Sequence, residues 1–128
     1  MPEDTILIVD DNPLNLKLAR LLLRSEGYDV HTAADAEEAQ VKLQTLRPRL
    51  ILMDVQLPGM DGLELTRRLK ADPATQDIII LALTAYAMKG DEEHIRNAGC
   101  DGYIPKPIDT RLLPTTVASY LTANRSRA

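Results

Sequence analysis

Five polar side chains directly follow apolar runs of the sequence, and their types are suited to a common chemistry. Asp10 and Asp11 come after Ile-Leu-Ile-Val, Asp54 after Leu-Ile-Leu-Met, Thr84 after Ile-Leu-Ala-Leu, and Lys106 after Tyr-Ile-Pro. If these runs are strands of one parallel sheet, their carboxyl ends share an edge, and ligands bind there where the strand order reverses. Three carboxylates, a hydroxyl and an ammonium group are therefore expected to converge at that edge.

A cluster of three carboxylates implies a compensating cation, because the charges repel one another at close range. No His or Cys belongs to the set, and all-oxygen ligation favours Mg²⁺ or Mn²⁺ over zinc. A hydroxyl and a lysine beside such a metal are suited to hold a phosphoryl group, since phosphoryl transfer depends mainly on positioning and charge neutralisation. Asp54 is the expected acceptor, because a carboxylate can form an aspartyl phosphate.

The elements that must position these residues follow an alternating pattern. Apolar, β-rich runs alternate five times with longer amphipathic stretches, which is typical of βα units that wind a parallel sheet with helices on both faces. Strands are predicted at residues 6–9, 29–32, 50–53, 78–83 and 102–104, and helices at 13–26, 36–46, 62–71, 88–98 and 110–122. We predict an α/β, doubly wound, flavodoxin-like fold with five parallel strands in the order 2-1-3-4-5 and five helices on two faces.

Local signals mark the ends of these helices. Asn12 and Asp35 are expected as N-caps, and Gly27 and Gly99 as left-handed C-caps. Pro114 indicates a late start or a distorted first turn in the fifth helix. We assign residues 1–122 to one domain and the small, polar residues 123–128 to a frayed tail.

Other conspicuous residues have simpler structural interpretations. Asp61 and Gly62 fit a turn and cap before the third helix. His31 and His94 have no matched ligand partners and are expected at the surface, and Cys100 is expected to be half-buried.

The composition is that of an ordinary globular domain. Of the 128 residues, 45% are hydrophobic and 27% are charged, and no apolar run approaches the roughly 20 residues that span a bilayer. A single cysteine and an acidic N-terminus favour a cytoplasmic protein without a membrane partner. Because 15 Lys and Arg stand against 19 Asp and Glu, the net charge of -4 disfavours direct binding to nucleic acid.

Four segments together resemble the receiver domain of two-component response regulators, the CheY-like family, over essentially the whole chain. They are Ile-Leu-Ile-Val-Asp10-Asp11-Asn12, Leu-Met-Asp54-Val-Gln-Leu-Pro58-Gly-Met-Asp61-Gly62, Leu-Thr84-Ala85 and Tyr103-Ile-Pro-Lys106-Pro107. The run Thr84-Ala-Tyr-Ala-Met-Lys-Gly-Asp-Glu-Glu is more particularly similar to single-domain receivers of the DivK type. The resemblance implies a phosphoacceptor protein, not an enzyme, with weak self-phosphorylation and self-dephosphorylation and no DNA-binding output domain.

The resemblance implies a role for each polar residue of the cluster. Asp54 would accept a phosphoryl group from the phosphohistidine of a histidine kinase or phosphotransfer protein. Asp11, Asp54 and the backbone carbonyl of Gln56 would ligate Mg²⁺, with Asp10 acting mainly through a bridging water. Lys106 would pair with Asp54 at rest and with a phosphoryl oxygen afterwards.

Further residues would respond to the phosphoryl group. Thr84 would donate its hydroxyl to a second phosphoryl oxygen, and Tyr103 would change rotamer as Thr84 moves. On its own Tyr103 would more often be a core residue than a switch, and its place three residues before Lys106 makes the two interpretations about equally favoured. Tyr86 would screen the phosphoryl group from water, and the Lys106–Pro107 bond would be cis.

The first predicted helix carries leucine on two opposite faces. At about 100° per residue, one face holds Leu16, Ala19, Leu22 and Leu23, and the other holds Leu14, Leu18 and Leu21. Only one face can lie on the sheet. The other is either covered by neighbouring side chains or docks a helical partner, and the resemblance favours a kinase or phosphotransfer helix bundle.

The fourth predicted helix is mostly polar and is weakly anchored. Ile95 is its main apolar residue, and weak anchoring favours mobility. Together with strand 102–104 and helix 110–122, it is the expected surface that reports phosphorylation to a downstream protein.

Three other functions fit parts of this pattern less well. A phosphohydrolase of the haloacid dehalogenase type needs a second Asp two residues after the nucleophile, where this chain has Gln56, and a cap insertion that it lacks. A nucleotide or flavin binder needs a glycine-rich first turn, which here reads Asp-Asp-Asn-Pro. The intact set of Asp54, Thr84 and Lys106 argues against a receiver-like scaffold that is never phosphorylated.

Overall fold

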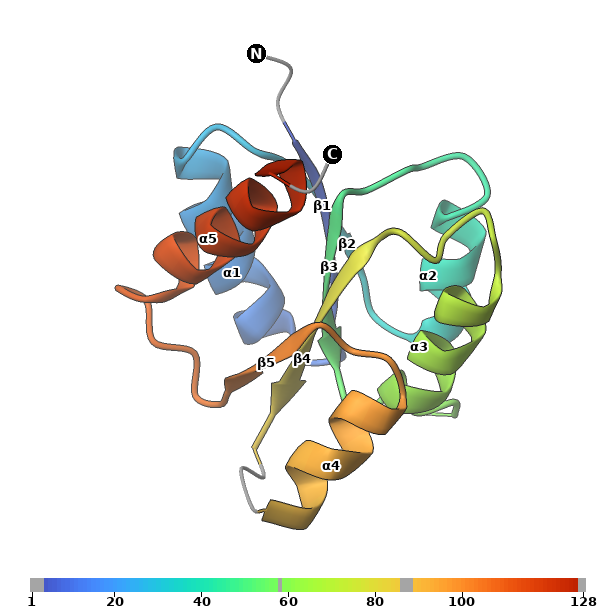
Figure 1. The fold of residues 1–128 in the computed structure, drawn as a ribbon. Helices are drawn as coiled ribbons and strands as arrows, with labels where there is room; N and C mark the ends of the chain where they lie inside the picture. The colour runs from blue at the N-terminus through green and yellow to red at the C-terminus, as the bar shows by residue number, and fades with distance from the viewer. Residues whose placement is uncertain (1–3, 58, 86–88, 127–128) are drawn as a thin grey trace.

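The chain forms one parallel sheet with helices on both of its faces (Figure 1). The computed structural model describes residues 4–57, 59–85 and 89–126. In chain order the elements are β1 (Thr5–Val9), α1 (Pro13–Ser25), β2 (Asp29–Ala33), α2 (Ala36–Lys42), β3 (Leu50–Asp54), α3 (Gly62–Ala71), β4 (Ile79–Thr84), α4 (Lys89–Asn97), β5 (Gly102–Pro105) and α5 (Leu113–Ser126). The strand order β2-β1-β3-β4-β5, parallel throughout, confirms the predicted fold.

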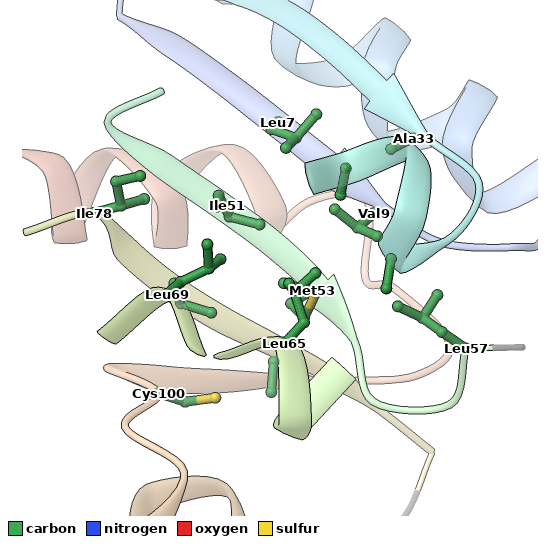
Figure 2. Packing of buried hydrophobic residues seen from close by; sticks show 14 of the residues in the cluster. Leu7, Val9, Ala33, Ile51, Met53, Leu57, Leu65, Leu69, Ile78 and Cys100 are labelled. Atoms are coloured by element: carbon green, nitrogen blue, oxygen red, sulfur yellow. The ribbon is translucent and has the colours of Figure 1, made fainter. Parts of the chain in front are cut away.

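Side chains of the central strands alternate between two apolar layers. Leu7, Val9, Ile51 and Met53 belong to the layer under α2, α3 and α4, whereas Ile6, Ile8, Leu50 and Leu52 belong to the layer under α1 and α5. Figure 2 shows the first layer, in which Leu65 of α3 lies beside Met53 of β3. A strand covered on both faces buries every side chain, which explains the unbroken apolar runs of the sequence.

The helix ends follow the signals predicted from the sequence. The side chain of Asn12 accepts hydrogen bonds from the N–H groups of Leu14 (2.9 Å) and Asn15 (3.3 Å), and so caps α1. Asp35 caps α2 in the same way. Gly27 and Gly99 have φ of 95° and 103°, in the left-handed region that other residues rarely adopt.

Helix α1 buries one of its two leucine faces. Ala19 and Leu23 are fully buried against the sheet and α5. Leu14, Leu18 and Leu21 remain 77%, 37% and 57% exposed. The predicted division into an inward and an outward set is confirmed, and all three outward leucines are exposed to solvent, Leu18 the least of them.

Two helices, α2 and α5, differ from their predicted bounds by more than one residue at an end. Helix α2 ends at Lys42 instead of residue 46, because the chain tightens there into hydrogen bonds between residues three apart, from Gln44 N–H to Val41 O and from Thr45 N–H to Lys42 O. Helix α5 starts at Leu113, which confirms the late start, and its backbone continues to Ser126, past the predicted end at 122. The division into a domain at 1–122 and a frayed tail stays a prediction.

Pro114 lies in the first turn of α5, where its missing N–H leaves no helical hydrogen bond unmade. The preceding residues form a turn in which Leu112 and Leu113 both donate to the carbonyl of Asp109. This turn takes the place of the helical residues expected from 110.

Cys100 is more buried than predicted. Only 9% of the residue is exposed, because it lies in the apolar layer against α3, where its Sγ is 3.9 Å from the hydroxyl of Thr66. The histidines are at the surface as expected: His94 is exposed, and His31 is half-exposed, 3.1 Å from Asp29 Oδ2. No helix in the described part of the chain is long and apolar enough to cross a membrane.

The thiol of Cys100 should therefore react slowly in the folded protein. Burial raises its pKa to about 11, so the nucleophilic thiolate is scarce at about pH 8. We expect iodoacetamide to label the native chain on the order of 100-fold more slowly than the urea-unfolded chain, as measured by mass spectrometry. Equal rates in the two states would contradict the buried position.

Candidate functional site

Four neighbouring strand ends bring the predicted polar residues to one edge of the sheet. Asp54 is the last residue of β3 and Thr84 the last of β4, while Asp10 follows β1 and Lys106 follows β5. The register aligns these ends, since Val9 pairs with Met53, Asp54 with Leu83 and Thr84 with Pro105. The parallel sheet thus places them side by side.

Three carboxylates meet at this edge in the geometry of a cation site. Asp10, Asp11 and Asp54 each offer one oxygen within 4.8 Å of the others. Asp10 and Asp54 are buried, whereas Asp11 is exposed to solvent. Two of the three negative charges are therefore withdrawn from water, where their repulsion is strongest.

One lysine opposes this negative charge. Lys106 Nζ lies 3.0 Å from Asp54 Oδ2 and 3.6 Å from Asp10 Oδ2. The backbone N–H of Lys106 donates to the carbonyl of Thr84 at 2.7 Å, and the Lys106–Pro107 bond is cis, as predicted. The resting pair between Lys106 and Asp54 is present as the family resemblance implies.

Backbone N–H groups orient the two buried carboxylates. Asn12 N–H donates to Asp10 Oδ1 at 2.9 Å, and Gln56 N–H donates to Asp54 Oδ1 at 3.1 Å. Asp54 Oδ2 faces Lys106, but Asp10 Oδ2 has no hydrogen-bond partner among the described residues, since Lys106 Nζ is beyond hydrogen-bond distance. A buried carboxylate oxygen without a partner needs an explanation. A hard cation held by oxygen atoms supplies one, so the donor set fits Mg²⁺.

The electrostatics of the site raise the pKa of Asp54 when no cation is bound. The pKa of Asp54 is raised from its ordinary 3.8 to about 6, mainly by burial and in smaller part by the negative charge of Asp10. The Lys106 ammonium and the Gln56 N–H act in the opposite direction and lower the pKa. A bound cation would favour the charged carboxylate, which is the form that can attack phosphorus.

Two other predicted residues lie close to this cluster. Thr84 is buried at the end of β4, beside the lysine that its carbonyl binds. Tyr103 in β5 is half-buried and packs against the apolar layer under α3 and α4. The rotamer change of Tyr103 stays a prediction, and Tyr86 lies outside the described residues.

The connection from β3 to α3 argues against a hydrolase. Helix α3 begins at Gly62, shortly after β3 ends at Asp54, and Gln56 stands where a second Asp would act as an acid in such a hydrolase. Asp61 caps α3 by accepting from Glu64 N–H at 2.8 Å, as predicted.

Two contributors to the site were not apparent from the sequence pattern. Asn12 was expected only as a helix cap, yet its backbone N–H also orients Asp10. Gly62 was expected as part of a turn, yet it is buried directly against the main chain of Asp54. The only sequence signal for the second contact is a glycine at a helix start, where other residues are usually favoured.

Comparison with known proteins identifies the family. Residues 6–118 match the family model of the response regulator receiver domain. The chain belongs to the response regulator receiver family. It is 47% identical over 121 residues to the polar-differentiation response regulator DivK of Brucella anthropi, and the match covers 94% of this chain and 98% of that protein. Members of this family are phosphoacceptors of two-component signalling and are not classical enzymes.

Solved receiver structures agree with this assignment. A CheY-like receiver domain protein from Methanospirillum hungatei superposes with a TM-score of 0.90 at 32% identity and covers 98% of this chain and 99% of that chain. The receiver domain of a sensor histidine kinase from Pseudomonas aeruginosa superposes with a TM-score of 0.85 at 36% identity and covers 94% and 98%. That structure holds a magnesium ion coordinated in its active site cleft.

Neutralising Asp54 should stabilise the metal-free receiver. Its folded-state pKa of about 6 lies above the ordinary 3.8, so folding stability is lost as the pH rises from about 4 to about 6. Asn has no proton to lose, and we expect Asp54→Asn to raise the free energy of unfolding at pH 7 by about 1 to 3 kcal/mol. Urea unfolding of both proteins at pH 7, in the presence of a metal chelator, measures this difference in the free energy of unfolding.

The exposed Asp77, beyond the opposite end of the sheet, provides the control for this substitution. Asp77→Asn should change the free energy of unfolding by less than about 0.5 kcal/mol. A receiver that loses stability at pH 7 with Asp54→Asn would show that the buried charge is fully compensated by Lys106 alone.

Proposed function

We propose that this receiver accepts a phosphoryl group on Asp54 from the phosphohistidine of a histidine kinase or phosphotransfer protein. The observation that carries the proposal is the pair of buried carboxylates, one with an unpartnered oxygen, opposed by Lys106 at 3.0 Å from Asp54. In the transfer, the nitrogen–phosphorus bond of the donor histidine breaks and an oxygen–phosphorus bond to the Asp54 carboxylate forms. The imidazole is the leaving group, and phosphorus is neither oxidised nor reduced.

The residues around Asp54 have separate roles in this step. Asp10, Asp11, Asp54 and the backbone carbonyl of Gln56 would hold Mg²⁺ or Mn²⁺, which when bound offsets the negative charge of the incoming phosphoryl group. The Gln56 N–H orients the Asp54 carboxylate through one oxygen, at 3.1 Å.

Lys106 and Thr84 supply the remaining contacts to the phosphoryl group. Lys106 exchanges its resting contact with Asp54 for a phosphoryl oxygen. The Thr84 hydroxyl donates to a second oxygen, and Tyr103 follows the movement of Thr84. The same groups give the protein weak self-phosphorylation with small phosphodonors and weak self-dephosphorylation.

Phosphorylation is proposed to change the face formed by α4, β5 and α5. Among residues 92–97 of α4, only Ile95 is buried, so few contacts hold this helix to the sheet. A hollow of about 280 Å³ lies beside it and is lined by Ile95, Tyr103 and Tyr120, among others. If Tyr103 changes rotamer in this hollow, the shape of the surface that a downstream protein contacts changes. The phosphoryl group shifts this equilibrium only through its different contacts with the two states.

The donor is proposed to dock on the outward leucines of α1. Leu14, Leu18 and Leu21 are exposed at the helix that starts directly after Asp10 and Asp11. We call these three residues the leucine stripe. A helix bundle that docks on the leucine stripe would lie over the edge of the sheet that carries the three carboxylates. With a net charge of -4 and no membrane-spanning helix in its described part, the protein is proposed to act in the cytoplasm on other proteins, without nucleic acid or membrane as partner.

Labelling with acetyl phosphate tests the acceptor. The wild-type chain should gain one phosphoryl group, detected by mass spectrometry, and a chelator should slow this labelling at least about tenfold because the carboxylates then repel the donor. Asp54→Asn should abolish it, while Asp77→Asn should label normally. Labelling retained in Asp54→Asn would place the acceptor elsewhere.

Substituting Leu18 separates docking from chemistry. A charge in the middle of the leucine stripe removes apolar contact area, and we expect Leu18→Asp to slow phosphotransfer from a histidine kinase at least about tenfold. Acetyl phosphate needs no docking, so its labelling should remain at the wild-type rate.

Val41 on α2 provides a matched control for Leu18, since it is an exposed apolar residue outside the stripe. Val41→Asp should leave both reactions unchanged. If Leu18→Asp slows both reactions equally, the substitution has damaged the fold and the docking proposal fails; if it slows neither, the stripe is not the docking surface.

A further inference from the structure

The backbone conformation at Gly62, the first residue of α3, does not require a glycine. Its φ is not positive, so a residue with a side chain could adopt the same conformation. Glycine is intrinsically a poor choice within a helix because it loses more conformational freedom on folding. Gly62 is nevertheless buried, which indicates that the absence of a side chain itself has a function here.

The neighbour of Gly62 is the peptide group of the acceptor residue. A Cβ atom at Gly62 would overlap the carbonyl oxygen of Asp54 and lie 2.9 Å from its carbonyl carbon. It would also lie 3.0 Å from Met53 Cγ. The nearest obstacle is main chain at the end of a central strand and cannot rotate away, so either α3 or the end of β3 would have to move.

Hydrogen bonds hold the first turn of α3 in this position. Gly62 N–H donates to Val55 O at 3.0 Å, directly after the acceptor. The hydroxyl of Thr66, which is fully buried, donates to Gly62 O at 2.8 Å. The helix start is therefore tied to the chain that leaves Asp54 on one side and to its own second turn on the other.

This position matters because the site depends on short contacts from the same stretch of chain. Asp54 Oδ2 is 3.0 Å from Lys106 Nζ, and Asp54 Oδ1 is 3.1 Å from Gln56 N–H. A shift of the Asp54 peptide group by a few tenths of an ångström would change both contacts. It would also move the Gln56 carbonyl relative to the other carboxylates.

We propose that Gly62 is a positioning residue for the acceptor site. Lacking a side chain, it lets the first turn of α3 pack directly against the Asp54 peptide group. This contact fixes where the Asp54 carboxylate and the Gln56 carbonyl stand relative to Asp10 and Lys106. The inference rests on the proposed function of Asp54, and it adds a residue that touches neither metal nor phosphoryl group.

The test compares Gly62→Ala with a substitution that weakens the same helix far from the site. Leu69 is buried at the other end of α3, so Leu69→Ala lowers stability without reaching Asp54. Mg²⁺ affinity is measured by calorimetric titration, and the amide NMR signals of Val55 and Gln56 are recorded in the metal-free protein. Gly62→Ala should weaken Mg²⁺ binding at least about tenfold and shift these signals, as loss of a supporting group does at metal sites. Leu69→Ala should change the Mg²⁺ affinity by less than about twofold. It should leave the amide NMR signals of Val55 and Gln56 where they are in the wild type.

A milder pair of variants keeps the proposal testable if Gly62→Ala does not fold. Thr66→Val removes the hydroxyl that holds the Gly62 carbonyl, and we expect it to weaken Mg²⁺ binding about twofold to fivefold, because the helix start is less tightly fixed. Cys100→Ala removes the other partner of that hydroxyl and should not change the affinity.

The outcomes separate this inference from the proposed function. A wild-type chain that neither binds Mg²⁺ nor labels with acetyl phosphate defeats the proposed function. If the wild type does both and Gly62→Ala matches it, or if Leu69→Ala loses as much affinity as Gly62→Ala, the positioning role is overturned. If Gly62→Ala is unfolded, an unchanged Mg²⁺ affinity in Thr66→Val likewise overturns the positioning role.

Discussion

The structure depends on holding two carboxylates together where they repel each other. Asp10 and Asp54 are buried at adjoining strand ends, and with Asp11 they set three negative charges against the single positive charge of Lys106. Loss of hydration on burial is the main cause that raises the pKa of Asp54 to about 6, and the negative charge of Asp10 adds to it. Under the proposed function, a cation or an added phosphoryl group would act on this site because either one changes its charge balance.

The rest of the chain divides into a stiff frame and a loosely attached surface. Strands β1, β3 and β4 carry almost only apolar side chains that are fully buried between two helical layers, so the strand ends cannot separate to relieve the repulsion. Helix α4 has a different character, since Ile95 is the one buried side chain among its residues 92–97. Under the proposed function, a change in charge at the rigid edge would be expressed where the structure is held by the fewest contacts, which we propose is the face of α4, β5 and α5.

Much of this arrangement could be predicted because the deciding signals are local. Unbroken apolar runs identify central strands, and the polar residue after each run marks the strand end that carries it. The features that sequence reasoning missed depend on tertiary approach. The packing of Gly62 on Asp54 and the burial of Cys100 are set by how close α3 comes to the sheet, which no residue pattern within the helix encodes. The end of α2 at Lys42 depends in the same way on turn geometry beyond its apolar pattern.

The acceptor site and the proposed docking stripe are joined through a single residue. Asn12 holds Asp10 Oδ1 with its backbone N–H at 2.9 Å and caps α1 with its side chain, bonded to Leu14 N–H at 2.9 Å. The direction in which α1 leaves the sheet is thereby tied to the orientation of a buried carboxylate of the site. A donor that docks on Leu14, Leu18 and Leu21, as proposed, would contact a surface whose placement relative to Asp10 is set in part by these two hydrogen bonds. On this proposal, docking and transfer would require no large rearrangement of the receiver, because the proposed docking surface and the proposed acceptor adjoin the same edge of the sheet.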